Sequence, residues 1–213
     1  MREIPKDKII SRSSSQFNQT IEVALENGIL VLNSDNGNYS YGNLHVVFDE
    51  VFRTENIGKK QYKHILLLGM GAGSVIDLLK NNYNQKKLFT AVEIDAEIIH
   101  VSRQYFNLDS YKNCSVINQD AYDFVFETKD IYDLIIVDIY IDLDIPSQFE
   151  SEEFISQLFH ICDTNGIIMF NKVVQSSKQM RQFSKLAALF DARAHTYHYT
   201  LLDFNKILVS KKD

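Results

Sequence analysis

The chain has 213 residues, of which 45% are hydrophobic and 12% aromatic, and its formal net charge is −6. This length and composition predict a well-packed globular protein with one domain, or one domain and a small appendage. The acidic balance argues against a nucleic-acid partner, because such proteins usually carry a basic stripe that neutralises phosphates. No apolar stretch is long enough to span a bilayer, and the first eight residues lack the apolar core of a signal peptide. We therefore expect a cytoplasmic protein that acts on a small cationic or neutral molecule.

The cysteines and histidines give no sign of a metal site or a nucleophile. Cys114 and Cys162 form no close-spaced pair, which predicts buried, reduced thiols. His195 and His198 are three residues apart on a predicted strand, so they fall on opposite faces and cannot chelate one metal together. No serine or cysteine lies in a recognisable nucleophile elbow, which makes acyl transfer improbable.

The first quarter of the chain predicts a β-hairpin followed by one helix. Residues 1–15 are polar and predict a loose lead-in. Residues 16–25 alternate with the period of a half-buried strand, residues 26–28 read as a hairpin turn, and residues 29–32 as the returning strand. The apolar spacing in residues 41–56 is helical.

The next stretch is a buried strand that breaks into alternating glycines. Residues 64–68 form an apolar run without alternation, which indicates a parallel strand buried on both faces, and residues 74–79 have helical spacing. Between them lie Gly69, Gly71 and Gly73. Glycines at such a turn let the backbone approach a ligand, although a tight strand-to-helix turn is the alternative explanation.

An acidic residue completes this signal. Glu93 ends a second buried strand, residues 88–93, twenty residues beyond Gly73. A carboxylate at that distance is placed to accept hydrogen bonds from the two hydroxyls of a ribose. The third glycine comes one position early for a dinucleotide fingerprint, where Ser74 stands instead. The pattern therefore favours an adenosine ligand without a pyrophosphate.

The pattern of strand, turn and helix then repeats to the end of the chain. Asp95 is a candidate helix cap. The later elements are predicted as a helix over residues 95–106, a strand over 114–118, a helix over 119–126, a strand over 132–138, a helix over 150–162, a turn at 165–166, a strand over 167–170, a helix over 176–190, and a hairpin over 195–202 and 207–209. Five βα units in series imply a parallel, doubly wound sheet with the terminal hairpin at one edge.

Four stretches of the chain resemble a known family. Residues 65–74, 92–95, 118–121 and 132–138 are similar to successive motifs of the class I S-adenosylmethionine-dependent methyltransferases, and within them most resemble the spermidine synthase-like branch. The resemblance implies an α/β fold with a doubly wound, mostly parallel seven-stranded sheet and a small N-terminal β-hairpin. It implies an N-terminal extension, residues 1–56, and an S-adenosylmethionine-binding domain, residues 57–213. In that branch dimers are usual.

The resemblance also implies a cofactor site for S-adenosylmethionine or its decarboxylated form. Asp120 matches the family's acceptor for the adenine amine, and Ala121 would offer a backbone N–H to the ring. Capping of the helix that follows is an equally good explanation for Asp120, and both roles can hold together. The residues assigned to the cofactor are Gly69, Gly71, Gly73, Glu93, Asp120 and Ala121.

Asp138 is the candidate catalytic residue. It ends a buried strand, and the carboxyl ends of such strands face the crevice where doubly wound folds bind ligands. Apolar surroundings should raise the pKa of its carboxyl, which suits it to accept a proton from an attacking amine or to hold a cation. The aromatic rings of Tyr41 and Tyr140 are candidates for the acceptor pocket, with ordinary packing as the alternative.

The polyamine motifs of the branch are only partly kept. Polyamine synthases carry an Asp-Ser-Ser-Asp-Pro type motif where residues 138–142 read Asp-Ile-Tyr-Ile-Asp, and a Tyr-His-Glu motif where residues 41–43 read Tyr-Gly-Asn. Methyl transfer to an unidentified small acceptor is therefore the leading hypothesis. Aminopropyl transfer, the spermidine synthase reaction, is the first alternative. A non-catalytic protein that keeps the fold is the second.

Overall fold

The structure is a computed structural model that describes residues 8–34, 37–40, 43–140, 145–202 and 204–212. The chain divides into two compact units. Unit 1 comprises Met1–Lys59, Met70–Gln85 and Asp95–Lys112, and unit 2 comprises Lys60–Gly69, Lys86–Ile94 and Asn113–Asp213.

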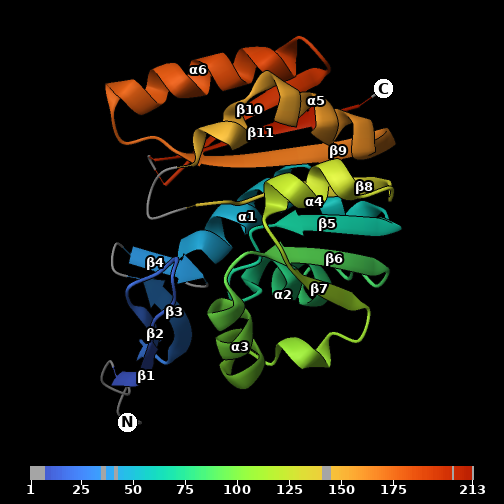
Figure 1. The fold of residues 1–213 in the computed structure, drawn as a ribbon. Helices are drawn as coiled ribbons and strands as arrows, with labels where there is room; N and C mark the ends of the chain where they lie inside the picture. The colour runs from blue at the N-terminus through green and yellow to red at the C-terminus, as the bar shows by residue number, and fades with distance from the viewer. Residues whose placement is uncertain (1–7, 35–36, 41–42, 141–144, 203, 213) are drawn as a thin grey trace. The chain divides into compact units, whose positions relative to one another are not determined.

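Unit 2 contains the large sheet that the sequence predicts. Its strands are β5 (His64–Leu68), β6 (Leu88–Glu93), β7 (Cys114–Asn118), β8 (Tyr132–Val137), β9 (Cys162–Val173), β10 (His195–Leu201) and β11 (Asn205–Lys211). They form one seven-stranded sheet in the order β10-β11-β9-β8-β5-β6-β7 (Figure 1). The five strands from β9 to β7 are parallel, and the hairpin β10–β11 is antiparallel. The doubly wound α/β fold class is thus confirmed.

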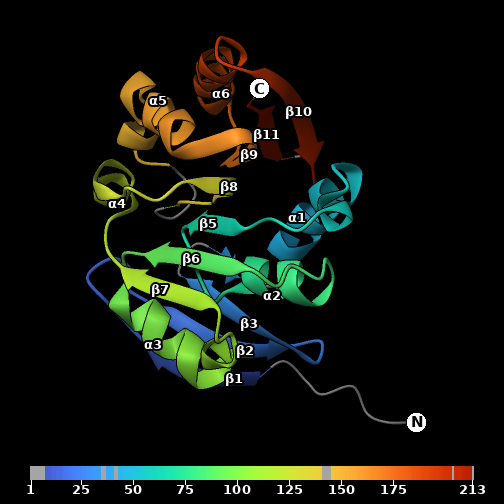
Figure 2. The ribbon, with the colours of Figure 1, turned by 90° about the vertical axis from the view of Figure 1, so that its right-hand side faces the viewer.

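Three helices of unit 2 pack on this sheet. Helix α4 (Ala121–Glu127) contacts β6, and α6 (Ser177–Asp191) contacts β10 and β11. Helix α5 (Glu152–Ile161) follows the short helix η3 (Ser147–Glu150) and contacts β9. Figure 2 shows α5 and α6 beside β9 and β11. Their apolar faces join the buried core of unit 2, whose members include Val137, Phe154, Phe170, Phe190 and Leu208.

Unit 1 contains a four-stranded antiparallel sheet. Its strands are β1 (Lys8–Ser13), β2 (Ile21–Glu26), β3 (Ile29–Ser34) and β4 (Gly37–Ser40), in that order. The unit also holds α1 (Asn43–Thr54), η1 (Ile57–Lys59), α2 (Ser74–Asn81), α3 (Ala96–Tyr105) and η2 (Leu108–Ser110). The predicted hairpin is β2–β3, with Asn27 and Gly28 at positive φ in its turn. Its core includes Ile21, Val23, Leu32, Ile98 and Val101.

The predicted loose lead-in over residues 1–15 is wrong for residues 8–13, which form strand β1. This strand pairs with β2 from Lys8↔Leu25 to Ser13↔Ile21. Its first three side chains are exposed, so the sequence carries no apolar alternation that would reveal it. The strand predicted over residues 16–25 begins only at Ile21, because the Ser15 hydroxyl accepts the N–H groups of Phe17 and Asn18 and holds a turn there.

The sequence also places the start of β9 too late. The predicted helix end at Cys162 and the turn at residues 165–166 are both part of β9. Asn165 adopts φ 61°, and its N–H donates to the carbonyl of Lys212 at 2.8 Å. The C-terminal segment therefore provides the partner that extends the strand, and nothing near residue 165 in the sequence signals it.

Candidate functional site

Three predicted site residues lie at one edge of the sheet in unit 2. Leu68 of β5 pairs with Val92 of β6 and with Val137 of β8, and Gly69, Glu93 and Asp138 are the next residues on these three strands. The Gly69 N–H donates to the carbonyl of Val92 at 3.0 Å, and the Asp138 N–H donates to that of Leu68 at 2.9 Å. This edge holds the carboxyl ends of the parallel strands, where open α/β sheets bind their ligands.

The conformation of Gly69 is required by the protein's own backbone. Gly69 has φ +83°, and a Cβ built on it would lie 2.2 Å from the carbonyl oxygen of Asp138 and 3.2 Å from the Cα of Ile139. No side chain fits there. The alternative explanation, a tight turn, is therefore sufficient for Gly69, and its contact with a cofactor stays a prediction.

Gly71 and Gly73 belong to unit 1, in the loop that leads into α2. Both have positive φ, 53° and 89°. The Ser102 hydroxyl donates to the carbonyl of Gly71 at 3.2 Å, which ties this loop to α3. Ser74, which stands where the dinucleotide fingerprint has glycine, is buried and receives a hydrogen bond from Ser40 at 3.1 Å. These two hydrogen bonds hold the loop to α3 and to Ser40 within unit 1.

Glu93 is a buried carboxylate, 3% exposed, at the end of β6. The chain around it is held by Asn118, whose Nδ2 donates to the carbonyls of Glu93 and Ile94 at 2.9 Å each. The N–H of Gln119 donates to the Glu93 carbonyl as well, at 3.2 Å. Sequence reasoning missed Asn118, although a polar amide that ends an otherwise apolar strand is a usable signal.

Asp120 is the cap of α4, which is one of the two roles expected for it. Its Oδ1 accepts the N–H of Tyr122 at 2.8 Å. Ala121, the first residue of α4, is buried. A carboxylate has a second oxygen with further acceptor sites, so capping leaves room for the adenine contact, which stays a prediction.

Asp95 caps α3 in unit 1, which confirms that prediction too. Its side chain accepts the N–H of Glu97 at 3.0 Å. It also accepts from the Ser15 hydroxyl at 2.5 Å and from the Asn18 amide at 2.8 Å. The carboxylate thereby joins the β1–β2 loop to α3, a tertiary role that the sequence did not reveal.

Asp138 is half-buried and hydrogen-bonded to a residue that sequence reasoning missed. The Nδ2 atom of Asn171, on β9, donates to Asp138 Oδ1 at 2.9 Å. In turn Asn205 Nδ2, on β11, donates to Asn171 Oδ1 at 3.2 Å. Burial raises the pKa of Asp138 to about 6, against the opposing effect of the Asn171 hydrogen bond. The direction is that expected for a desolvated carboxyl.

Tyr140 follows Asp138 in the loop after β8. Its hydroxyl oxygen is buried, and the backbone of Val173, at the end of β9, offers it a hydrogen bond. Burial, Asp138 and Glu150 hold the pKa of this hydroxyl well above its ordinary value, so it is a neutral donor. Tyr41 and Asp142 lie outside the described residues.

A buried ion pair, also missed by sequence reasoning, lies at the end of β9. Lys172 Nζ is 2.5 Å from Glu150 Oε1, and the two side chains are 3% and 11% exposed. Lys172 follows Asn171 directly, and neighbouring residues on a strand face opposite sides. Asn171 thus donates a hydrogen bond to Asp138 on one face of the sheet, while Lys172 forms an ion pair with Glu150 on the other.

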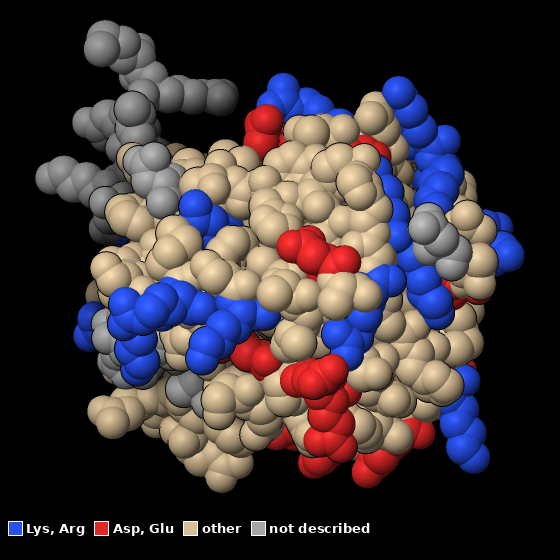
Figure 3. Space-filling model, turned by 90° about the horizontal axis from the view of Figure 1, so that it is seen from above, with Lys and Arg blue, Asp and Glu red and all other residues tan. Residues whose placement is uncertain are grey.

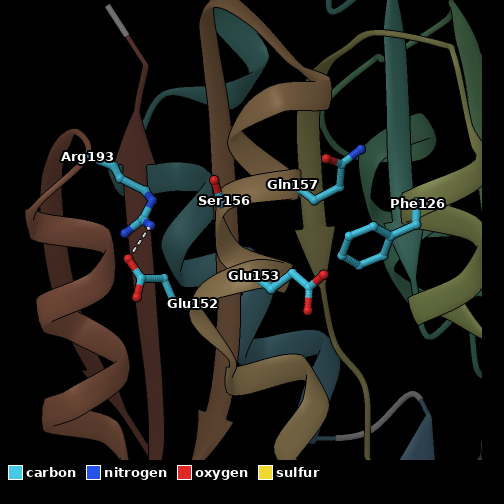
Figure 4. A pocket seen from close by; sticks show the side chains of 6 residues that line it. All are labelled: Phe126, Glu152, Glu153, Ser156, Gln157 and Arg193. Atoms are coloured by element: carbon cyan, nitrogen blue, oxygen red, sulfur yellow. Dashed lines mark hydrogen bonds and ion pairs between the residues drawn. The ribbon is translucent and has the colours of Figure 1, made fainter.

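The helical side of unit 2 carries a separate surface groove of about 520 Å³ (Figure 4). In that view the Phe126 ring is directed toward Glu153 and Gln157, and Arg193 pairs with Glu152. None of its lining residues was predicted as a ligand contact: Phe126, Glu152, Glu153, Ser156, Gln157 and Arg193. Figure 3 shows basic and acidic side chains together on one face of the molecule.

The described ranges of the chain hold no evident metal site. In them, no group of three or more His, Cys, Asp or Glu side chains could hold a metal ion. Cys114 and Cys162 are free thiols, the first half-buried and the second buried. No helix within these ranges is both long and apolar enough to cross a membrane.

The fold and the row of polar residues at its strand ends define a Rossmann-like sheet of the methyltransferase type. One solved structure with this fold, a probable spermidine synthase from Corynebacterium glutamicum ATCC 13032, matches with a TM-score of 0.80 at 18% identity, covering 97% of this chain and 80% of that one. The model of the spermine/spermidine synthase domain matches residues 51–201. The chain therefore belongs to the spermine/spermidine synthase domain family.

Two curated relatives have different names. A probable polyamine aminopropyl transferase from Bifidobacterium longum (strain NCC 2705) is 33% identical over 114 residues, which are 54% of this chain and 25% of that protein. An eEF1A lysine and N-terminal methyltransferase homolog from Drosophila melanogaster is 27% identical over 140 residues, 61% of this chain and 21% of that protein. The chain thus spans about a quarter or less of the length of either relative.

Proposed function

We propose that this chain transfers an aminopropyl group from decarboxylated S-adenosylmethionine to a small amine. The family and the name of the Bifidobacterium relative support this alternative more strongly than methyl transfer, the leading hypothesis from the sequence. The observation that carries the proposal is Asp138, a half-buried carboxyl with a pKa of about 6 at the carboxyl end of β8. Such a group is mostly ionised at neutral pH and can still accept a proton.

The polar groups of unit 2 suit an adenosyl cofactor. The buried carboxylate of Glu93 would accept the ribose hydroxyls. Asp120 would accept the adenine amine, and the N–H of Ala121, at the start of α4, has no partner within its own helix.

The cofactor supplies a sulfonium, whose carbon–sulfur bond breaks as the amine nitrogen bonds to the same carbon. The leaving group is a neutral thioether, so the positive charge passes to the amine, which must lose a proton. Asp138 would accept that proton, and its carboxylate would attract the cationic amine substrate to the site. The protein's further contribution is to hold the nucleophile in line and to exclude water.

Methyl transfer is the second candidate. It is favoured by the Drosophila relative and by residues 138–142, which keep only the first acid of the polyamine motif in its place. The same carboxylates would serve that reaction, because the two cofactors share the adenosyl group and the sulfonium. The products differ: aminopropyl transfer releases methylthioadenosine, and methyl transfer releases S-adenosylhomocysteine.

The test is to incubate the chain with putrescine and either decarboxylated S-adenosylmethionine or S-adenosylmethionine, and to identify products by mass spectrometry. Methylthioadenosine that depends on Asp138 is the expected result. Calorimetry with both cofactors accompanies the assay. Tighter binding of S-adenosylmethionine, with S-adenosylhomocysteine as the product, would replace the proposal with methyl transfer. Binding of neither cofactor would favour a non-catalytic protein that keeps the fold.

A further inference from the structure

We infer that Asn171 is a positioning residue that fixes the carboxylate of Asp138 for proton acceptance, and that Asn205 fixes Asn171 in turn. The inference rests on the proposed transfer reaction and adds two residues to it. Both asparagines lie far from Asp138 in sequence, and the pairing of β8, β9 and β11 brings them close to it.

The three side chains form a line across neighbouring strands. Val137 of β8 pairs with Phe170 of β9, so Asp138 and Asn171 are the next residues on their strands. Asn171 pairs with Ile207 of β11, and Asn205 lies two residues before Ile207, where side chains are diagonal neighbours on one face. The two hydrogen bonds, 2.9 and 3.2 Å, follow this line.

The orientation of the Asn171 amide is set by its two partners. An amide has one accepting and one donating end. Because Asn205 donates to Oδ1, the donating Nδ2 end faces Asp138. With the amide reversed, an oxygen would face the carboxylate. Asn205 therefore selects the orientation that supports an ionised Asp138.

Asn171 occupies a position where an apolar residue would otherwise be expected. It is 0% exposed, and it follows Ile167, Ile168, Met169 and Phe170 on the same strand. Burial of an amide is unfavourable unless its hydrogen bonds are made, and here both ends have partners. The buried amide is therefore best explained by the carboxylate it serves.

The other polar groups near Asp138 do not replace this donor. The charges of Asp138 and of Glu150 in η3 both raise the pKa of the Tyr140 hydroxyl, whose hydrogen bond is to the backbone of Val173. The charge of Glu150 is matched by Lys172 of β9. Glu93, at the end of β6, is a further carboxylate on this edge. A hydrogen bond donated to the ionised carboxyl favours that form, so Asn171 opposes the desolvation of Asp138.

The experiment replaces the Asn171 amide by a side chain of similar size without a donor, Asn171→Leu. We expect the acidic limb of the pH profile of kcat/KM for putrescine to move up by about one pH unit, with the affinity for decarboxylated S-adenosylmethionine unchanged. Asn205→Ala should shift the limb in the same direction by less. Asn33→Leu is the matched control, because Asn33 donates to the carboxylate of Glu26 at 2.7 Å in the other sheet.

A second readout does not depend on activity. Titration of ¹³C-labelled aspartate carboxyls by NMR, with Asp138 assigned through Asp138→Asn, should show an upward shift of the Asp138 pKa in both variants, larger in Asn171→Leu than in Asn205→Ala. An unchanged Asp138 titration in Asn171→Leu or in Asn205→Ala would overturn the inference. If Asn171→Leu does not fold, Asn205→Ala decides alone. If no transfer occurs with either cofactor, the proposed function fails, while the NMR titration still tests the positioning role.

Discussion

The carbonyl oxygen of Asp138 occupies the space in which a side chain on Gly69 would begin. A Cβ there would lie 2.2 Å from that oxygen, a distance that real Cβ contacts do not show. The backbone of Gly69, which opens the turn after β5, therefore packs directly against the backbone of Asp138, which follows β8. The position of Asp138 depends on the absence of a side chain at residue 69.

Replacement of Gly69 by a larger residue should therefore lower the free energy of unfolding by more than the backbone strain at positive φ alone would. Gly28 is the matched control, because its φ of +81° is close to the +83° of Gly69 and nothing lies within 4 Å of its Cβ position. We expect Gly28→Ala to cost about 1 kcal/mol from backbone strain alone, and Gly69→Ala to cost at least about 2 kcal/mol more. Urea unfolding of both variants measures the difference. Equal losses would show that the loop after β8 yields easily.

The two roles of Asp120 can be separated by keeping the cap and removing the carboxylate. Serine is a good N-cap and alanine is not, so Asp120→Ala should lose about 1 kcal/mol of stability and Asp120→Ser much less. If the carboxylate also binds adenine, both variants should bind decarboxylated S-adenosylmethionine about tenfold more weakly, a loss of about 1.4 kcal/mol. Thermal unfolding and calorimetry give the two quantities. Wild-type affinity in Asp120→Ser would leave only the capping role.

The raised pKa of Asp138 makes the free energy of unfolding depend on pH. Because this pKa rises from 3.8 to about 6 on folding, the native state binds more protons than the unfolded state between these values. Stability should therefore fall as the pH rises through this window, with a penalty of up to about 3 kcal/mol above it. The substitution Asp138→Asn removes this charge and keeps the hydrogen bond, because Asn171 Nδ2 can donate to the side-chain amide oxygen of the variant.

Asp138→Asn should thus abolish turnover and stabilise the protein at neutral pH, with little change below about pH 4. Urea unfolding at a series of pH values measures the effect. The control is Asp130→Asn, which removes an exposed carboxylate near the start of β8. A stability difference that does not vary with pH would contradict the burial of a charged carboxylate at residue 138.

The Lys172–Glu150 pair predicts a large loss on removal of one partner only. Lys172→Met leaves the Glu150 carboxylate buried without its cation, which should cost about 3–5 kcal/mol. The double variant Lys172→Met/Glu150→Leu should recover most of this loss, because an apolar pair of similar volume needs no desolvation. Arg53→Met, at an exposed pair with Glu50, should change stability by less than about 1 kcal/mol. Urea unfolding of these variants is the measurement, and a double variant as unstable as the single one would contradict the explanation.

The elements that the sequence predicted correctly are those with local signals. The unbroken apolar runs of β5, β6 and β8 are local in the sequence, and so are the caps Asp95 and Asp120, each of which directly precedes its helix. The positions of Gly69, Glu93 and Asp138 also followed, because a parallel sheet places the carboxyl ends of its strands at one edge. Strand β1 and the start of β9 did not follow, since each is defined by the strand it pairs with and not by its own side chains.

The sequence by itself determined the fold class and the polar residues at the carboxyl ends of β6 and β8, while their contacts with an adenosyl group stay predictions. Only the tertiary structure shows that the Asp138 carbonyl excludes a side chain at Gly69, and only it shows that Asn171 is the hydrogen-bond partner of Asp138. Asn171 lies 33 residues from Asp138 along the chain, and Asn205 lies 34 residues from Asn171. Hydrogen bonds over such separations depend on strand register. Register is set by the packing of the whole sheet, and no local sequence pattern records it.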